Sequence, residues 1–167
     1  TNPAPTVEQY AAAGVTDVTA ANLADVNAAV NAAAGTAADE VSEVQALVAT
    51  EVAADALAVI AAYAANSDTN PAGTNPAPTE ADYAAAGVTD VTAANLADVN
   101  AAVDAAAGTA ADEVSEVQAL VTADALGVIA AYASNSDTNP AGTNPAPTVE
   151  QYAAAGVTDV TAANLAD

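Results

Sequence analysis

The chain has 167 residues, with no Lys, Arg or His against 22 Asp and Glu residues, and its formal net charge is −22. Because phosphate recognition needs Lys or Arg, this composition excludes nucleic acid as a direct partner and disfavours an anionic membrane surface. Hydrophobic residues make up 53% of the chain, mostly as Ala, and Cys, Met, Trp and Phe are absent. Disulfide bonds are therefore excluded. No apolar run looks long and bulky enough to span a bilayer, so no membrane insertion is expected.

A tandem repeat organises the sequence. The motif TNPAPT begins a first repeat at 1–73, a second at 74–142 and the start of a third at 143–167. Residues 1–25 are identical to 143–167, so one long and one short repeat together form a larger period of 142 residues. Near-identity at this level indicates a window onto a longer array of repeats.

The first helix of each repeat is predicted at about 7–13 and 80–86. It follows a Pro-Ala-Pro stretch that cannot lie inside a helix. Thr6 is placed to cap it, and Gln9 occupies the position where a capping box has Glu or Gln. Gly14 is a natural helix stop, because it can adopt the left-handed conformation.

The second helix is predicted at about 20–34 and 93–107. Thr19 is the expected N-cap, with Thr16 as the alternative. Gly35 is expected to end the helix. A helical stripe of core residues consists of Leu23, Val26 and Val30.

The third helix is predicted to be long, at about 37–65 and 110–134, after the cap Thr36. A break near Thr50 is the competing interpretation. The first copy is four residues longer than the second, which shifts a helix face by only about 40°. Its apolar stripe comprises Val41, Val44, Val48, Val52, Val59 and Tyr63.

These elements predict an all-α fold, built as a tandem array of small three-helix bundles. Linkers rich in Pro and Asn, at 66–78 and 135–147, would join the bundles. In the second repeat the expected caps are Thr79, Thr92 and Thr109, and the expected helix stops are Gly87 and Gly108.

The tyrosines are the largest side chains in the sequence. They occupy Tyr10 and Tyr83 in the first helix, Tyr63 and Tyr132 near the end of the third, and Tyr152 in the third repeat. We expect core or junction packing between repeats. Stacking platforms for a ligand are the alternative.

The acidic residues offer little chemistry. Asp39, Glu40 and Glu43 form the densest cluster, but they lie in the first turn of a helix, where they favour the helix dipole. With no His, Cys or Lys to assist a nucleophile, we expect no enzymatic activity. No cofactor is expected apart from calcium, which oxygen ligands could bind. The candidates are the linker residues Asn66, Asp68, Asn70, Asn135, Asp137 and Asn139.

At YAAAGVTDVTAANLADVNAAV, from Tyr10, and at DEVSEVQALV, from Asp39, the chain resembles the helical repeats of large secreted bacterial surface adhesins of the RTX and biofilm type. It is also distantly similar to GA-type three-helix modules. The first resemblance implies a secreted segment, outside the cell or on its surface, that holds a distal adhesive domain away from the cell.

The expected function is therefore structural: a stalk, spacer or fibre segment whose partners are the neighbouring repeats and, in a fibre, like chains. A spacer should be monomeric, with a length proportional to the number of repeats. The alternatives are a protein-binding three-helix module and a self-assembling extracellular filament subunit.

Overall fold

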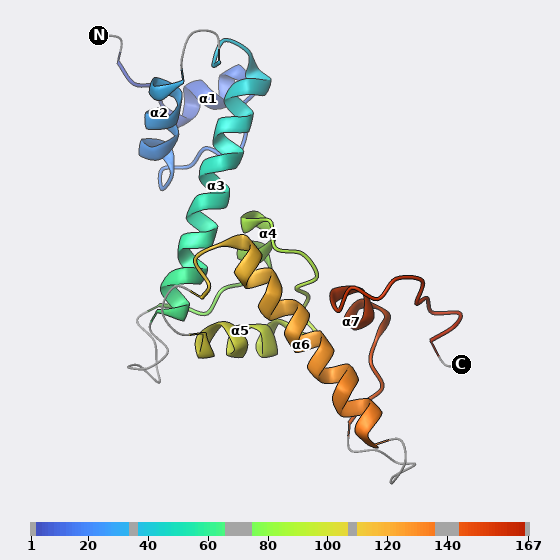
Figure 1. Ribbon diagram of the computed structural model, residues 1–167. Helices are drawn as coiled ribbons and strands as arrows, with labels where there is room; N and C mark the ends of the chain where they lie inside the picture. Colours follow the sequence, from blue (N-terminus) through green and yellow to red (C-terminus); the bar gives the residue numbers. More distant parts are fainter. Residues whose placement is uncertain (1–2, 34–36, 66–74, 107–109, 136–143, 166–167) are drawn as a thin grey trace. The chain divides into compact units, whose positions relative to one another are not determined.

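The computed structural model describes residues 3–33, 37–65, 75–106, 110–135 and 144–165, and every regular element in these ranges is an α-helix (Figure 1). The all-α prediction is confirmed. The chain forms two compact units, Thr1–Ala56 and Leu57–Asp167, which we call the N-terminal and C-terminal units.

The N-terminal unit contains α1 (Val7–Ala13), α2 (Leu23–Ala32) and most of α3 (Val41–Ala64). Its core is formed by Tyr10 from α1, Val26 from α2, Val48 from α3 and two valines of the α1–α2 connection. Each of these elements is too short or too weakly amphipathic to persist alone, so mutual burial stabilises them.

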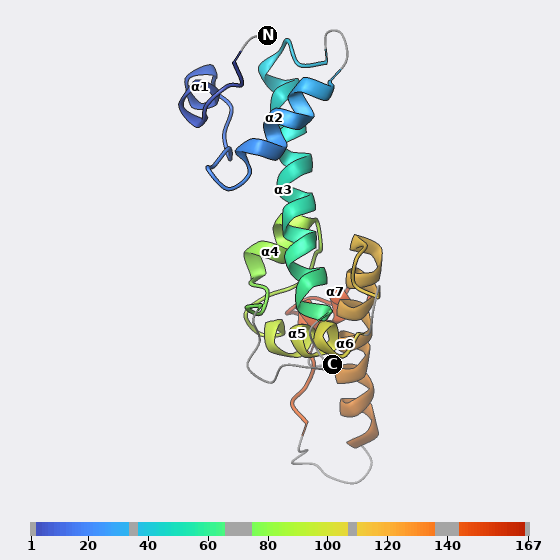
Figure 2. The same cartoon turned by 90° about the vertical axis from the view of Figure 1, so that its left-hand side faces the viewer.

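The C-terminal unit contains the last turns of α3 together with α4 (Glu80–Ala86), α5 (Leu96–Ala105), α6 (Val114–Asn135) and α7 (Val149–Ala154). Within it, the end of α3 lies beside α4 and α5 (Figures 1 and 2). Its largest fully buried side chains are Ile60, Tyr83, Val99, Val103, Val117 and Val121.

The boundary between the compact units falls between Ala56 and Leu57, inside α3. It does not coincide with the sequence boundary at 73/74. The reason is that the last turns of α3 pack with the repeat that follows them, so the sequence repeat and the folded unit are out of phase.

The first helices are capped as their sequences favour. Thr6 accepts a hydrogen bond from the Gln9 amide while the Gln9 side chain accepts one from the Thr6 amide, and Thr79 forms the same box with Asp82. Gly14 ends α1 in the left-handed region with φ of 88°, and Gly87 ends α4 in the same way. The backbone N–H groups of the two glycines donate to carbonyl oxygens in the last turn of each helix.

The second helices begin three residues later than predicted, and Thr19 and Thr92 are not their N-caps. Asn22 and Asn95 occupy that position. The Asn22 side chain accepts a hydrogen bond from the Thr19 amide and donates one to the Asp17 carbonyl, so residues 19–22 form a turn before the helix. Asp17 itself has a positive φ of 66°.

The ends of the second helices also differ from prediction. α2 ends at Ala32 and α5 at Ala105, before the expected glycine stops. Ala33 and Ala106 are the C-caps, in extended conformation. The expected stops Gly35 and Gly108 and the expected caps Thr36 and Thr109 lie outside the described residues.

The long helix α3 runs without interruption through Thr50, whose hydroxyl donates a 3.0 Å hydrogen bond to the Ala46 carbonyl. A break there is therefore excluded. The helix starts at Val41, about four residues later than predicted, because the Glu43 carboxylate accepts the amides of residues 39 and 40 in a preceding turn. α6 starts in the same way at Val114.

Candidate interaction site

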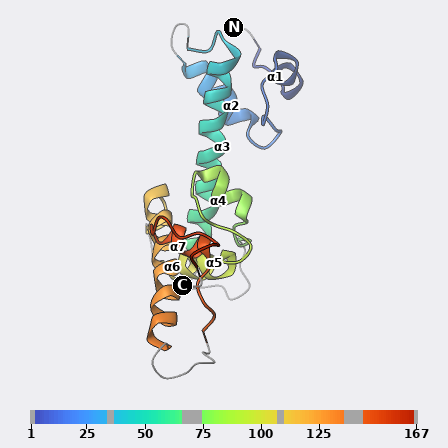
Figure 3. The same ribbon diagram turned by 90° about the vertical axis from the view of Figure 1, so that its right-hand side faces the viewer.

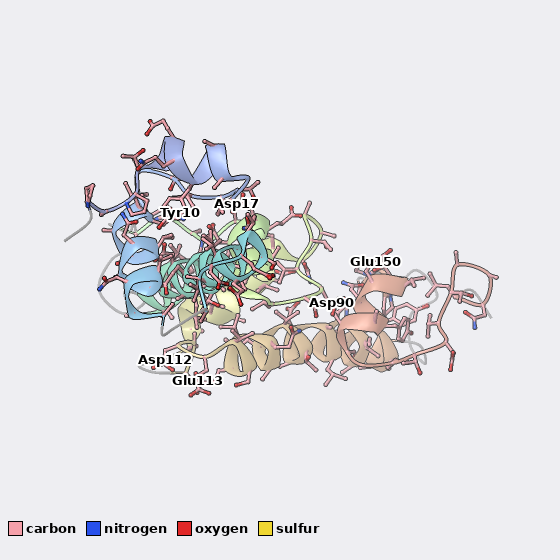
Figure 4. The ribbon with its side chains drawn as sticks, turned by 90° about the horizontal axis from the view of Figure 1, so that it is seen from above. Tyr10, Asp17, Asp90, Asp112, Glu113 and Glu150 are labelled. Carbon is pink, nitrogen blue, oxygen red and sulfur yellow. The ribbon has the colours of Figure 1, made fainter. Side chains whose placement is uncertain are left out.

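Two linked hydrogen bonds, which we call the polar relay, connect the tyrosine of each first helix to an asparagine of the second helix and then to the carbonyl of the preceding proline. The Tyr10 hydroxyl donates to Asn27 Oδ1 at 2.8 Å, and Asn27 Nδ2 donates to the Pro5 carbonyl at 3.1 Å. Figure 4 labels Tyr10 between α1 and α2. Burial raises the pKa of the Tyr10 hydroxyl above its ordinary value, so the group remains a donor further into the alkaline range.

The C-terminal unit repeats this relay in a buried form. The Tyr83 hydroxyl donates to Asn100 Oδ1 at 2.7 Å, and Asn100 Nδ2 donates to the Pro78 carbonyl at 3.0 Å. Burial raises the pKa of Tyr83 strongly, and the charges of Tyr63 and Asp82 add to the effect. The relay was not predicted, although a tyrosine followed 17 residues later by asparagine recurs in both repeats.

A second unpredicted feature ties the long helix to the connection before the second helix. Gln45 Oε1 accepts the Thr16 amide at 2.8 Å, and Gln118 accepts the Thr89 amide at 2.9 Å. Both pairs are 29 residues apart. The alternative cap Thr16 is thus a partner of the long helix rather than the start of the second.

The N-terminal unit has an open apolar groove of about 410 Å³. Its lining includes the start of the chain, α1, α2 and the start of α3. Apolar and aromatic lining residues are Pro5, Tyr10, Ala13, Val30, Ala38 and Val44, and Asp39 and Glu40 supply carboxylates. We call this surface the groove.

Several positions that line the groove are buried at their equivalents in the C-terminal unit, whereas the equivalents of Asp39, Glu40 and Val41 are exposed. Ala13 is exposed, but its equivalent Ala86 is only 3% exposed. Val30 is partly exposed, but its equivalent Val103 is fully buried. The same change is seen from Pro5 to Pro78, from Ala38 to Ala111 and from Val44 to Val117.

The end of α3 belongs to the same compact unit and is itself buried. Ile60 is fully buried and Ala64 is 2% exposed, both within the C-terminal unit. Asn75 Nδ2 donates a 2.8 Å hydrogen bond back to the Ala62 carbonyl.

The Tyr63 hydroxyl interacts electrostatically with groups of α4 and α5. Burial, and then the carboxylate of Asp104 on α5, raise the pKa of Tyr63. Tyr63 in turn contributes to the raised pKa of Tyr83 on α4. Tyr83 is the equivalent of Tyr10, which lines the groove, whereas Asp104 is the equivalent of Asn31, which does not.

The end of α6 carries the same sequence features on a more open surface. Asn144 Nδ2 donates to the Ala131 carbonyl at 3.1 Å, as Asn75 does to Ala62, and α7 packs against α6 (Figure 3). Leu126 remains 49% exposed and Tyr132 42% exposed. We call residues 126–134 the tail segment.

The predicted core residues thus have different environments. Tyr83 and Val26 are fully buried, and Tyr10 is 6% exposed. Leu23, Val30 and Tyr63 are partly buried, and Tyr132 is exposed.

One carboxylate in each acidic cluster accepts backbone amides at the start of a long helix. The Glu43 carboxylate accepts the amides of Asp39 and Glu40, and Glu116 accepts those of Asp112 and Glu113, which Figure 4 labels beside α6. Within the described ranges no group of three or more acidic residues is arranged to hold a metal ion. The calcium candidates lie outside the described residues, apart from Asn135 at the end of α6.

Two helices are long and apolar enough to cross a membrane by length and composition, which differs from the expectation drawn from the sequence. They are α3 and Val114–Ser134 of α6, with mean hydropathies of 1.7 and 1.4. Every 18-residue stretch of α3 contains Glu51 and Asp55. An Asp at the bilayer centre costs about 2.5–3.5 kcal/mol, whereas each Val, Leu or Ile contributes about −0.3 to −0.6 kcal/mol.

Comparisons of the chain with family models, with curated proteins and with solved structures find no match.

Proposed function

We propose that this chain is a structural segment of a linear repeat array, built as a series of small helical bundles in which the long helix of one repeat completes the bundle of the next. The observation that carries the proposal is the burial of Ile60 and Ala64, which belong to the first repeat by sequence, within the C-terminal unit. A repeat whose bundle is completed by the long helix of its neighbour gains stability from being in an array.

The proposed role is mechanical and non-catalytic. In the acidic clusters, the Glu43 and Glu116 carboxylates accept backbone amides at the starts of the long helices. Like charges along the array would keep separate arrays soluble and apart. The resemblance to adhesin repeats further suggests a stalk of a secreted bacterial surface protein. Antibodies to the repeat are then expected to label intact producing cells, and labelling that requires lysis would contradict this placement.

Solution X-ray scattering tests the spacer role. Proteins carrying one and two periods of 142 residues would be measured and extrapolated to zero concentration. We expect the maximum dimension to grow in proportion to the number of periods, with the mass of a single chain. A two-period protein no longer than the one-period protein would refute the spacer role.

The continuity of α3 can be tested in the same experiment. Ala54→Pro removes a helical hydrogen bond and clashes with the preceding turn, at a cost of about 3 kcal/mol or more. Ala54 is exposed, so Ala54→Ser is a matched control. We expect the proline variant alone to broaden the distribution of interatomic distances. Identical distributions for both variants would exclude the helix as the mechanical link.

A further inference from the structure

We propose that residues 75–78 form a stiff strut that fixes the connection between two repeats onto the bundle of the following repeat, with Asn75 and Asn100 as its positioning residues. The inference rests on the proposed function and deepens it, because it names what holds the chain in place as it passes from one repeat to the next. The sequence alone predicts these residues only as the end of a linker at 66–78.

The strut begins at Asn75, whose side chain is anchored on the preceding long helix. Asn75 Nδ2 donates a 2.8 Å hydrogen bond to the carbonyl of Ala62, in the last turn of α3. The equivalent segment, residues 144–147, begins in the same way, because Asn144 Nδ2 donates to the Ala131 carbonyl at 3.1 Å. Each pair is 13 residues apart, although α3 has 24 residues and α6 has 22. The anchor is therefore placed relative to the end of the long helix, and it recurs in both connections.

The strut ends at Pro78, whose side chain is fully buried in the C-terminal unit. Proline has no backbone N–H group, so its carbonyl oxygen is the only backbone group that needs a partner when the residue is buried. Asn100 Nδ2 on α5 supplies that partner at 3.0 Å, and Asn100 is itself only 9% exposed. Pro147, at the end of the equivalent segment, is buried as well. The strut is therefore anchored at both of its ends.

Tyr83 fixes the orientation of the Asn100 side-chain amide. A carbonyl oxygen can only accept a hydrogen bond, so Asn100 must turn its Nδ2 toward Pro78 and its Oδ1 toward Tyr83. The Tyr83 hydroxyl donates to that Oδ1 at 2.7 Å, and the Tyr83 side chain is fully buried. The polar relay therefore holds the second end of the strut in one arrangement.

The residues between the two anchors have little conformational freedom. Pro76 and Pro78 each fix φ at about −65°, and the residue before a proline is kept out of the helical region. The capping box of Thr79 and Asp82 then starts α4 directly after the strut. The chain is thus held at each step from Asn75 to α4, and the strut ties the end of α3 to α4 and α5. Bending an array at this connection would require one of the anchors to break.

Spin labels test whether the strut is docked. The chain contains no Cys, so a single Cys introduced at Ala77 or at Ala146 carries the only label. Both alanines are exposed and lie between the two prolines of their segments. The line shape of a nitroxide label reports motion on the nanosecond timescale. We expect restricted motion at both positions in the otherwise unchanged full chain.

Asn75→Asp tests the first anchor. The substitution replaces the amide with a carboxylate of nearly the same shape, which cannot donate to the Ala62 carbonyl. The population with a mobile label at Ala77 should rise about tenfold, a factor that corresponds to about 1.4 kcal/mol. The label at Ala146 should not change. Asn144→Asp is the matched control, because it adds the same charge and should mobilise the label at Ala146 only.

Asn100→Asp tests the second anchor. The new carboxylate still accepts from the Tyr83 hydroxyl but cannot donate to the Pro78 carbonyl. We expect it to mobilise the label at Ala77 and to leave the label of the other segment unchanged. Ala101→Asp adds the same charge at an exposed position of α5 and should leave both labels restricted.

Circular dichroism checks that each variant keeps its helix content. If the Asn100→Asp chain unfolds, the reciprocal effects of Asn75→Asp and Asn144→Asp decide alone. A label at Ala77 that is mobile without further substitution, no effect of Asn75→Asp, or equal mobilisation of both labels by it would each overturn the strut, as would equal effects of Ala101→Asp and Asn100→Asp.

These outcomes differ from a failure of the proposed function. The spacer role fails when a two-period protein is no longer than a one-period protein, and the labels can remain restricted in that case. Mobile labels in a protein whose length still grows with the number of periods would refute the strut alone.

Discussion

Replacing Ile60 with Ala tests whether a residue of the first repeat stabilises the fold of the second. The Ile60 side chain is fully buried in the C-terminal unit. Each buried methylene contributes about 0.8 kcal/mol, and the remaining cavity adds to the loss, so Ile→Ala substitutions in cores cost about 2–5 kcal/mol. The better helix propensity of Ala offsets less than about 0.7 kcal/mol. We expect the C-terminal unit to lose about 3 kcal/mol of unfolding free energy.

Hydrogen exchange read by mass spectrometry locates the effect. Amides in α4 and α5 should exchange about 100-fold faster, since about 1.4 kcal/mol corresponds to a factor of ten. Amides in α1 and α2 should change little. Val59→Ala is the matched control, because Val59 is 39% exposed and its truncation should cost less than about 1 kcal/mol. Faster exchange in α1 and α2 with α4 and α5 unchanged would refute the shared helix.

Three further predictions concern the polar groups. Tyr83→Phe leaves Asn100 Oδ1 buried without its donor and should cost about 1–3 kcal/mol in urea unfolding, more than Tyr10→Phe in the more open unit; equal costs would contradict the difference in burial. The pKa of Tyr83 is raised in the folded state, so its contribution to stability is full below the unfolded pKa of about 10 and is lost as pH rises further. The melting temperature should therefore fall as the pH rises above about 10, and it should fall less in the Tyr83→Phe variant. An equal fall in both proteins would exclude this tyrosine as the cause. Burial, and then the charge of a neighbouring aspartate, raise the pKa of Asp124, so Asp124→Asn should raise the melting temperature at neutral pH. The equivalent Asp55 is exposed, so Asp55→Asn should have little effect, and a rise of equal size there would point to net charge alone.

Local signals in the sequence predict local structure well. Thr6, Gln9 and Gly14 specify the start and stop of α1 through side-chain and backbone geometry within one or two turns, and the predicted bounds match. The second helix begins later than its threonine signal predicts, because the Asn22 side chain holds residues 19–22 in a preceding turn. The Asn22 side chain donates to the carbonyl of Asp17, which has a positive φ, and the sequence alone does not reveal that backbone conformation.

The buried face of the long helix was harder to predict. The apolar stripe drawn from the larger side chains includes Val41 and Val59, which are 48% and 39% exposed. Ala56, Ile60 and Ala64 are buried instead. Alanine is common on every face of this helix, so hydropathy gives almost no amphipathic signal, and burial is decided by which neighbour packs closely.

The groove and the tail segment were not predicted either, because both depend on where the folded units divide. The Pro-rich linkers are local signals that indicate a boundary at 73/74. The burial of Ile60 in the C-terminal unit is a tertiary effect and leaves no local signal in the sequence. Comparing equivalent positions, such as Ala13 with Ala86, is what reveals them.

The offset between sequence repeat and folded unit also bears on how such a gene can change. Residues 1–25 and 143–167 are identical, which makes them natural sites for unequal recombination. A crossover there inserts or deletes a whole period, and each inserted period supplies both a helix end and the surface that receives it. The number of repeat periods can therefore differ between lineages while the packing between successive repeats stays the same. The length of the protein can then evolve without a new interface.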